Sequence, residues 1–187
     1  LFQFFIKHII YSYIMCFDNQ WDLYYDTLAI LEQHEIRKTR SRANVSGLYK
    51  KTPYGRQGIS CRSQNFGVVY NRWKAGVSRL EPIEAVNNRT YPVLYNQLKK
   101  VIREIEPNFQ YNTITVNHNL KCLPHYDKAN KSPSLILTLG DFDGGRLIVE
   151  GCAIDIHWKP LIMNGSSAEH STEEFTGERY SIIYYNI

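Results

Sequence analysis

The stretch that decides the fold is Ser134–Val149, which reads SLILTLGDFDGGRLIV. Two short apolar runs, Ser134–Leu139 and Arg146–Val149, lie on either side of Asp143-Gly144-Gly145. Short runs rich in Leu, Ile and Val are typical of strands when Gly and Asp residues bound them, because those residues favour turns. The stretch therefore predicts two short strands joined by a turn.

The same pattern continues in both directions through the second half of the chain. The further strand-like runs are Tyr111–Val116, Ala153–His157, Leu161–Met163 and Tyr180–Tyr185. Many short strands separated by turns favour a sandwich or a jelly roll. The mouth of such a roll is a place where a small cofactor can bind.

The first half of the chain carries helical signals instead. Asp22–Ile36 has apolar residues at helical spacing. A stronger helix begins with Thr90 as its cap and Pro92 in its first turn, and Pro107 ends it. Its predicted apolar stripe consists of Leu94, Leu98, Val101, Ile102 and Ile105. We expect both helices to support the roll by packing against its sheet.

A length of 187 residues allows one substantial core and is short for two domains. We therefore predict a single α+β domain, mainly β, over residues 1–187. Residues 1–108 would form a helical and basic-loop region that packs on a β-roll core of residues 109–187. Residues 1–17 are apolar, but polar residues interrupt them and no small-residue cleavage site follows. We interpret them as a strand or helix on the core, not as a signal sequence or a membrane span.

His125-Tyr126-Asp127, followed by His170, has the composition of an open metal site. Side chains on an extended segment repeat every two residues, so His125 and Asp127 point the same way. Two imidazoles and one carboxylate hold Fe(II) by three bonds and leave positions free for a co-substrate and dioxygen. Structural metal sites have closed shells instead. A His-x-Asp alone is more often a surface turn, so the prediction depends on the order and spacing of all three residues.

Arg179 and Ser181 share a face of the last strand-like run. A guanidinium beside a hydroxyl suits a carboxylate, and the expected one is the distal carboxylate of 2-oxoglutarate, whose other end would chelate the iron. Tyr111, Asn117 and Asn119 precede the His-x-Asp turn and could hydrogen-bond this co-substrate. They could equally be ordinary strand and turn residues.

The segment Ile36–Leu80 is the second strong signal, because it holds eleven Lys and Arg and no Asp or Glu. The chain has a formal net charge of +4, so the remainder carries −7. An ordinary solvated surface mixes both signs. Basic loops with interleaved aromatics suit a phosphate backbone and unstacked bases, and Lys50, Lys51 and Arg56 lie together in one glycine-flanked loop. The alternative is a flexible basic loop with no partner. One of these arginines is also a candidate for binding the inner carboxylate of 2-oxoglutarate.

From roughly Phe109 to Ile187, the order of these motifs resembles the 2-oxoglutarate- and Fe(II)-dependent dioxygenases. Those enzymes carry His-x-Asp, a later His, and Arg-x-Ser on the following strand of a double-stranded β-helix. Within that superfamily the chain is most similar to the TET/JBP branch, the oxygenases of thymine and 5-methylcytosine in DNA. TET-type enzymes read His-x-Asp-x-x-Asn, and Asn130 is in place. Tyr185, six residues after Arg179, matches a Tyr that stacks on the base.

Two features of this sequence differ from the pattern of the TET/JBP branch. Ile187 stands where a base-contacting His is expected, and these 187 residues contain no long cysteine-rich zinc region. The resemblance therefore implies a compact relative in which Asn130 hydrogen-bonds a flipped base and Tyr185 stacks on it.

The resemblance implies an enzyme that uses Fe(II), 2-oxoglutarate and O2 to oxidise the methyl group of 5-methylcytosine or thymine in DNA. The base must be flipped out because its methyl group lies in a duplex groove. The basic segment would hold the strand, which could also be RNA. The alternatives are a protein hydroxylase acting, for instance, on prolyl residues, and a non-catalytic β-roll that binds nucleic acid.

The four cysteines form no Cys-x-x-Cys pair, so neither a zinc knuckle nor a disulfide framework is predicted. A reducing intracellular compartment is the simpler interpretation and suits a ferrous enzyme. We expect a monomer that is nuclear or DNA-associated, is not secreted and has no membrane contact.

Overall fold

The computed structural model describes residues 20–70 and 81–187, so the strand or helix expected at residues 1–17 lies outside the described residues. The described helices are α2 (Trp21–Gln33), α3 (Ala43–Ser46), α4 (Val86–Thr90) and α5 (Pro92–Ile105). The described strands are β1 (Lys38–Thr39), β2 (Tyr49–Thr52), β3 (Gly55–Gly58), β4 (Cys61–Tyr70), β5 (Pro82–Glu84), β6 (Thr113–His118), β7 (Ser134–Gly144), β8 (Leu147–Val149), β9 (Cys152–Ile154), β10 (Leu161–Met163), β11 (His170–Thr172) and β12 (Phe175–Tyr185).

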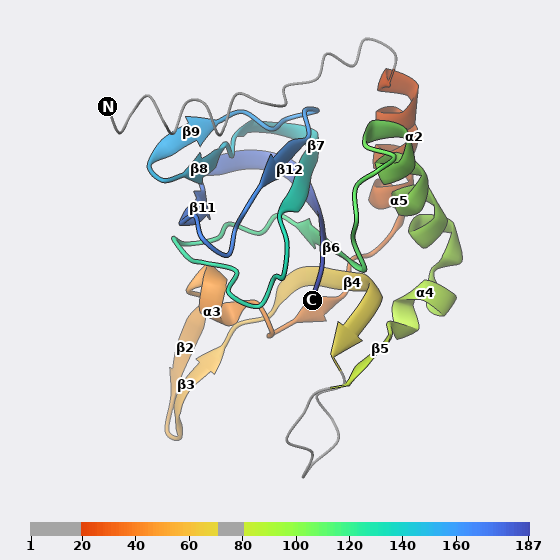
Figure 1. The fold of residues 1–187 in the computed structure, drawn as a ribbon. Helices are drawn as coiled ribbons and strands as arrows, with labels where there is room; N and C mark the ends of the chain where they lie inside the picture. Colours follow the sequence, from red (N-terminus) through yellow and green to blue (C-terminus); the bar gives the residue numbers. More distant parts are fainter. Residues whose placement is uncertain (1–19, 71–80) are drawn as a thin grey trace.

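The largest sheet has seven strands, in the order β1-β4-β6-β12-β7-β10 with β5 paired to β4. Its strand pairs are antiparallel. A three-stranded sheet, β11-β8-β9, lies against one side of it (Figure 1). The fold is therefore mainly β, as the sequence predicted, and the pairs of the large sheet are antiparallel.

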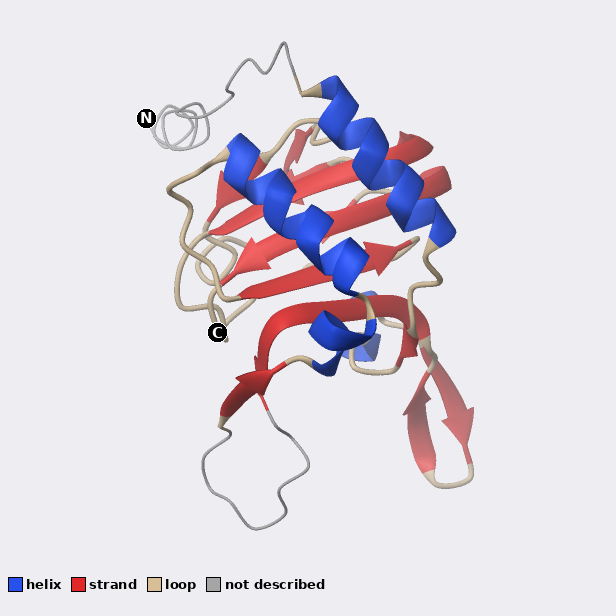
Figure 2. Ribbon diagram, turned by 90° about the vertical axis from the view of Figure 1, so that its right-hand side faces the viewer, coloured by secondary structure: helices blue, strands red, loops and turns tan. Residues whose placement is uncertain are grey.

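Helices α2 and α5 cover the opposite face of the large sheet (Figure 2). The apolar stripe of α5 is buried there, with Leu98 and Val101 at 0% exposure. These side chains join Leu137 of β7 and Ile182 of β12 in the main core. The predicted supporting role of both helices is confirmed by this packing.

The predicted cap of the second helix is wrong by one residue. Thr90 is the last residue of α4, and its hydroxyl donates to the carbonyl of Val86 at 3.1 Å. That hydroxyl is therefore already used within the preceding turn, and Tyr91 occupies the cap position. Pro92 begins α5 as predicted, because a helix needs no N–H at its first position.

A second core lies between the two sheets. Ile136 of β7, Leu147 and Val149 of β8, and Met163 of β10 pack there with their neighbours. Strand β7 is thus buried on both faces, which explains why Ser134–Leu139 reads as a continuous apolar run.

Two strands are longer than the sequence predicted. β7 continues to Gly144 and β12 begins at Phe175, because these strands pair from Phe175↔Gly144 onward. The extension carries exposed charged residues and glycines, which an apolar pattern does not detect. The expected turn therefore overlaps the end of β7, and the chain turns at Gly144 and Gly145, both with positive φ. The short strand β11 was also missed.

The basic segment is more regular than the predicted loops. Residues 36–70 form β1, α3, β2, β3 and β4, while the basic residues of 71–80 lie outside the described part. β4 pairs with β6 from Arg62↔His118 to Gly67↔Thr113 and buries Phe66 completely. Residues on both sides of position 108 therefore contribute to one sheet.

Within the described residues, no helix is long and apolar enough to cross a bilayer. Cys61, Cys122 and Cys152 have free thiols.

Candidate functional site

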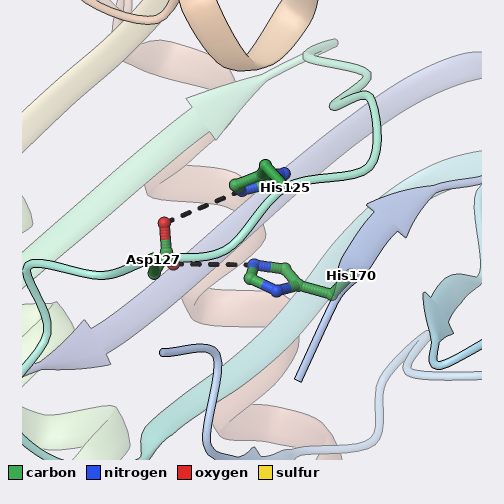
Figure 3. Close-up of side chains that lie close together, drawn as sticks. All are labelled: His125, Asp127 and His170. Carbon is green, nitrogen blue, oxygen red and sulfur yellow. Dashed lines mark ion pairs between the residues drawn. The ribbon is translucent and has the colours of Figure 1, made fainter. Parts of the chain in front are cut away.

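His125, Asp127 and His170 meet in a single cluster (Figure 3). Their potential ligand atoms all lie within 4.8 Å of one another. Nε2 of His125 is 3.7 Å from one carboxylate oxygen of Asp127, and Nε2 of His170 is 3.6 Å from the other. Three donors at these separations can contact one ion, so the predicted ligands do converge.

The second nitrogen of each imidazole is fixed by a backbone carbonyl. Nδ1 of His125 donates to the carbonyl of Leu123 at 2.7 Å, and Nδ1 of His170 donates to that of Ala168 at 3.1 Å. A proton on Nδ1 leaves the lone pair of Nε2 free, and such outer hydrogen bonds orient metal-binding histidines. In the neutral form with the proton on Nδ1, each ring presents Nε2 as the unprotonated nitrogen that a metal requires.

The backbone around the cluster fixes its spacing. His125 and His170 exchange two backbone hydrogen bonds of 3.0 Å, and the N–H of Asp127 donates to the carbonyl of Gly165 at 2.8 Å. A methyl group at Gly165 would lie 3.0 Å from Cε1 of His170. The three ligands are thus held by paired main chains and by a glycine that leaves room for one ring.

The electrostatics of the cluster follow from burial and proximity. Burial alone would raise the pKa of Asp127, but the hydrogen bond and charge of His170 outweigh it and lower that pKa. Burial lowers the pKa of His125. Burial also opposes protonation of His170, yet its pKa is raised because Asp127 is beside it. Asp127 is therefore an anion that a metal ion can use at neutral pH.

The cluster opens into a pocket of about 100 Å³ between the two sheets. Strand β12 contributes every second residue to its wall, namely Arg179, Ser181, Ile183 and Tyr185. The alternate residues of the same strand, such as Ile182, point into the core under the helices. This alternation follows from the period of two in a strand.

Arg179 is a buried cation that has no anionic partner among the residues that the structure describes. The residue is 3% exposed, and its Nε has no hydrogen-bond acceptor among the described residues. Its guanidinium lies 5.5 Å from the ring centre of Phe142 and 5.4 Å from that of Phe175. Burial lowers the pKa of Arg179 to about 10, so it remains charged at neutral pH. A buried charge of this kind is costly unless an anion pairs with it.

Ser181 is held as a hydrogen-bond donor beside Arg179. The hydroxyl of Ser63 donates to Oδ1 of Asn117 at 2.7 Å, and Nδ2 of Asn117 donates to Oγ of Ser181 at 3.1 Å. Because Oγ of Ser181 accepts this bond, its own proton is available to another acceptor. Asn117 lines the pocket as well, and its described contacts orient Ser181.

Arg42 is a charged residue of the pocket that sequence reasoning did not single out. It caps the short helix α3 and lines the pocket, where Nη2 donates to Oγ1 of Thr115 at 3.2 Å. It was one of eleven basic residues, and only the fold distinguishes it from the others.

Asn130 and Tyr185 also line the pocket. Nδ2 of Asn130 is 3.4 Å from Oδ2 of Asp127 and 3.2 Å from Oγ of Ser134. A carboxylate can only accept, so this contact fixes the amide orientation and leaves Oδ1 as the unused acceptor. The hydroxyl of Tyr185 is 3.1 Å from that of Thr115.

The other predicted site residues lie apart from this pocket. Tyr111 packs edge-on against Tyr184, on the helix-covered side of the sheet. Asn119 accepts the backbone N–H of Arg179 at 2.7 Å, so it positions the start of the strand segment that lines the pocket. The remaining three, Lys50, Lys51 and Arg56, are exposed on the β2–β3 hairpin.

No protein-family model and no curated protein sequence matches the chain. Among solved structures, NgTET1 in complex with 5mC DNA matches with a TM-score of 0.50 and 13% identity, over 66% of this chain. The chain shares its fold with NgTET1. The resemblance predicted from the motif order is therefore confirmed for the fold. The aligned part spans 60% of the NgTET1 chain.

Two further structures are similar at lower scores. An oxidoreductase of the 2OG-Fe(II) oxygenase family from Burkholderia pseudomallei matches with a TM-score of 0.47 and 17% identity, covering 84% of this chain and 77% of that one. OsALKBH1 matches with a TM-score of 0.43 and 15% identity, covering 92% and 94%.

Proposed function

We propose that this chain is an Fe(II)- and 2-oxoglutarate-dependent dioxygenase that oxidises the methyl group of 5-methylcytosine or thymine in DNA. The observation that carries the proposal is that one pocket contains both an open His-Asp-His cluster and Arg179, a buried cation with no anionic partner among the described residues. We read the two sheets as a double-stranded β-helix, in one domain over residues 1–187, with residues 109–187 as its iron-binding part.

The residues present fit a ferrous ion. Two neutral imidazoles and one carboxylate form one face of a coordination sphere, and this donor set is typical of non-haem iron oxygenases. His125, Asp127 and His170 would hold the ion. Bound iron would supply dioxygen activation, which no amino-acid side chain provides by itself.

The pocket also fits a dicarboxylate. Arg179 lacks an anion, and Ser181 has a free hydroxyl proton beside it, so together they can bind one carboxylate. Arg42 supplies a second cation, a candidate partner for the inner carboxylate of 2-oxoglutarate. The apolar side chains of Ile136 and Ile183 also line the pocket and would shield the carbon chain of the ligand from water.

A nucleic-acid base is the substrate that the remaining lining residues support best. Asn130 offers an unused carbonyl oxygen to a base edge, and Tyr185 offers an aromatic ring. The target methyl group lies in a duplex groove and the metal ligands lie in a pocket, so the base must be flipped. The similar NgTET1 structure contains 5mC DNA. Lys51 and Arg56 of the β2–β3 hairpin would contact the backbone of DNA, or of RNA. The protein would act as a monomer in a reducing compartment that contains DNA.

The test is product analysis under air with Fe(II) and 2-oxoglutarate. Methylated DNA, methylated RNA and a mixed peptide library are supplied separately, succinate is quantified, and nucleosides are examined by mass spectrometry. We expect succinate release coupled to a gain of one oxygen on the methylated base. Coupled release with peptides alone would establish a protein hydroxylase instead. Absence of Fe(II)-dependent succinate with all three substrates would leave a non-catalytic binding module.

A further inference from the structure

The β2–β3 hairpin is a projection that the pocket does not explain. Figure 1 shows it extending below α3, away from the sheets. Among the described strands, β2 and β3 pair only with each other. An isolated two-stranded hairpin is at best marginally stable in water. The hairpin therefore gains little stability from burial in a core.

The turn of the hairpin holds one large aromatic ring in solvent, since Tyr54 is 100% exposed. The hydroxyl of Thr52 accepts the N–H of Tyr54 at 3.3 Å and donates to the carbonyl of Gly55 at 2.8 Å. Gly55 has a φ of 109°, a conformation that side-chain-bearing residues rarely adopt. The turn is therefore preorganised to present a ring that contributes nothing to burial.

The strand register separates the basic residues of the hairpin onto two faces. Lys51 is directly opposite Arg56, whereas Lys50 is opposite Gln57. Directly opposite residues share a face, and neighbours along a strand point to opposite faces. The face of Lys51 and Arg56 also carries Tyr49, whose ring centre lies 4.3 Å from the guanidinium carbon of Arg56. Lys50 therefore points away from this pair.

The pairing of Lys51 with Arg56 is unfavourable for the hairpin alone. Like charges directly across a strand pair destabilise it. The segment from Ile36 to Leu80 contains no acidic residue that could offset the repulsion. A polyanion bound to this face would offset it.

The root of the hairpin lies at the rim of the pocket. A methyl group at Gly58 of β3 would lie 2.7 Å from Cβ of Ala43 in α3. In turn, the carbonyl of Val45 in α3 accepts the N–H of Leu123 at 2.7 Å, two residues before His125. Val45 itself lines the pocket. The root of the hairpin is therefore linked through α3 to the segment that carries His125.

We propose that the hairpin face bearing Tyr49, Lys51 and Arg56 binds a nucleic-acid backbone, and that Tyr54 stacks on a base displaced from the helical stack. This inference rests on the proposed function and deepens it by assigning a strand-holding surface beside the pocket. Lys51 and Arg56 neutralise phosphates. The ring of Tyr54 contacts a base face without reading its sequence.

The experiment measures binding of the 187-residue chain, without Fe(II), to fluorescent duplex and single-stranded oligonucleotides containing 5-methylcytosine, over a series of salt concentrations. We expect the slope of log affinity against log salt to flatten by about one in Lys51→Ala and in Arg56→Ala. Lys50→Ala is the matched control, because it removes the same charge from the opposite face; its slope stays at the wild-type value. An equal effect of Lys50→Ala and Lys51→Ala would mean that only net charge matters and would overturn the assignment of a face.

Tyr54 is tested by a pair of variants. Tyr54→Ala should weaken binding by about 5- to 150-fold, the range for losing one base–aromatic stack, with the salt slope unchanged. Tyr54→Phe keeps the ring and should bind as the wild type does. Unchanged affinity in Tyr54→Ala would contradict stacking. Loss of binding to a poly-glutamate peptide, without loss of binding to oligonucleotides, would identify an acidic protein as the partner instead.

Failure of this inference can be separated from failure of the proposed function. Succinate release without nucleic acid tests the pocket alone, and we expect the hairpin variants to match the wild type in it. Wild-type methyl oxidation together with hairpin variants that bind DNA normally would overturn only the inference. Hairpin-dependent binding in a chain that never releases succinate would overturn only the dioxygenase proposal.

Discussion

Replacing Arg179 by Met tests whether this cation binds a ligand or stabilises the fold. In the structure this cation is buried between Phe142 and Phe175 and has no anionic partner among the described residues. A structural cation should stabilise the fold, so its removal should lower stability. A ligand-binding cation instead costs stability until the ligand arrives, so its removal should raise the stability of the ligand-free protein. Methionine is a suitable replacement because it is long, flexible and packs well against aromatic rings.

The size of the effect follows from the pKa of Arg179. Burial lowers it from its ordinary value to about 10, which corresponds to roughly 3 kcal/mol against the charged form in the folded state. At neutral pH the group is charged in both the folded and the unfolded chain, so this cost is fully present, and it declines only as pH rises above about 10. Lost cation–π contacts offset part of the gain. We therefore expect Arg179→Met to stabilise the ligand-free protein by about 1–2 kcal/mol, roughly 2–8 °C in Tm for a chain of this size.

The assay is thermal unfolding with Fe(II) under nitrogen, with and without 2-oxoglutarate. At 100 times its Kd, a ligand stabilises the wild type by about 2.7 kcal/mol. Loss of a charge-assisted contact worth about 1.5–3 kcal/mol should reduce this stabilisation to about 0.3–1.4 kcal/mol in the variant. Arg146→Met is the matched control, because Arg146 is exposed and already paired with Glu173; its ligand response should equal that of the wild type. A variant at Arg179 that loses stability and still responds fully to 2-oxoglutarate would refute the reasoning.

Three other residues of the pocket and one glycine give further expected outcomes. Asp127→Ala should abolish Fe(II)-dependent succinate release while circular dichroism shows an intact fold, since the two cores contain none of the metal ligands. Gly165→Ala should weaken Fe(II) binding, measured by metal titration, because its methyl group would lie 3.0 Å from the His170 ring; unchanged affinity would mean that the ring has room to move. Arg42→Met should raise the 2-oxoglutarate requirement by roughly 10- to 150-fold, and a normal requirement would exclude Arg42 as a carboxylate ligand. Tyr185→Ala should weaken coupled oxidation of the base by about 1–3 kcal/mol and preserve uncoupled succinate release, whereas equal loss of both would make Tyr185 a structural residue.

Sequence patterns predicted the parts of the fold that follow from short-range periodicity. The stripe of α5 and the bounds of β10 are as expected, because each depends on residues a few positions apart. The convergence of His125 and Asp127 was predictable for the same reason. The position of Arg179 and Ser181 on one face of β12 was also predictable, because side chains on a strand repeat every two residues.

The features that sequence reasoning missed depend on contacts between distant segments. The cap of α5 differs because the hydroxyl of Thr90 bonds back to Val86, a competition that a capping pattern does not include. β4 joins the large sheet through pairing with β6, about 50 residues later in the chain. The alternation of polar residues that marks β4 was not recognised, because β4 lies within the basic segment Ile36–Leu80 and that segment was interpreted from its charge. Tyr111 differs from the expectation because its neighbours in the fold are core residues such as Tyr184.

The position of Arg42 shows how one basic segment can supply cations both to the pocket and to the exposed hairpin. Arg42 immediately precedes α3, and four residues separate α3 from the paired cations of the hairpin at Lys51. Its side chain enters the pocket, while Lys51 and Arg56 stay in solvent. The short helix α3 therefore separates two groups of basic residues. Arg42 lies in a small enclosed pocket that suits a carboxylate, whereas Lys51 and Arg56 lie on an exposed hairpin that suits a polyanion. α3 also hydrogen-bonds to the loop that leads to His125. Under the proposed function, a nucleic-acid strand bound at the root of the β2–β3 hairpin would therefore lie near the pocket.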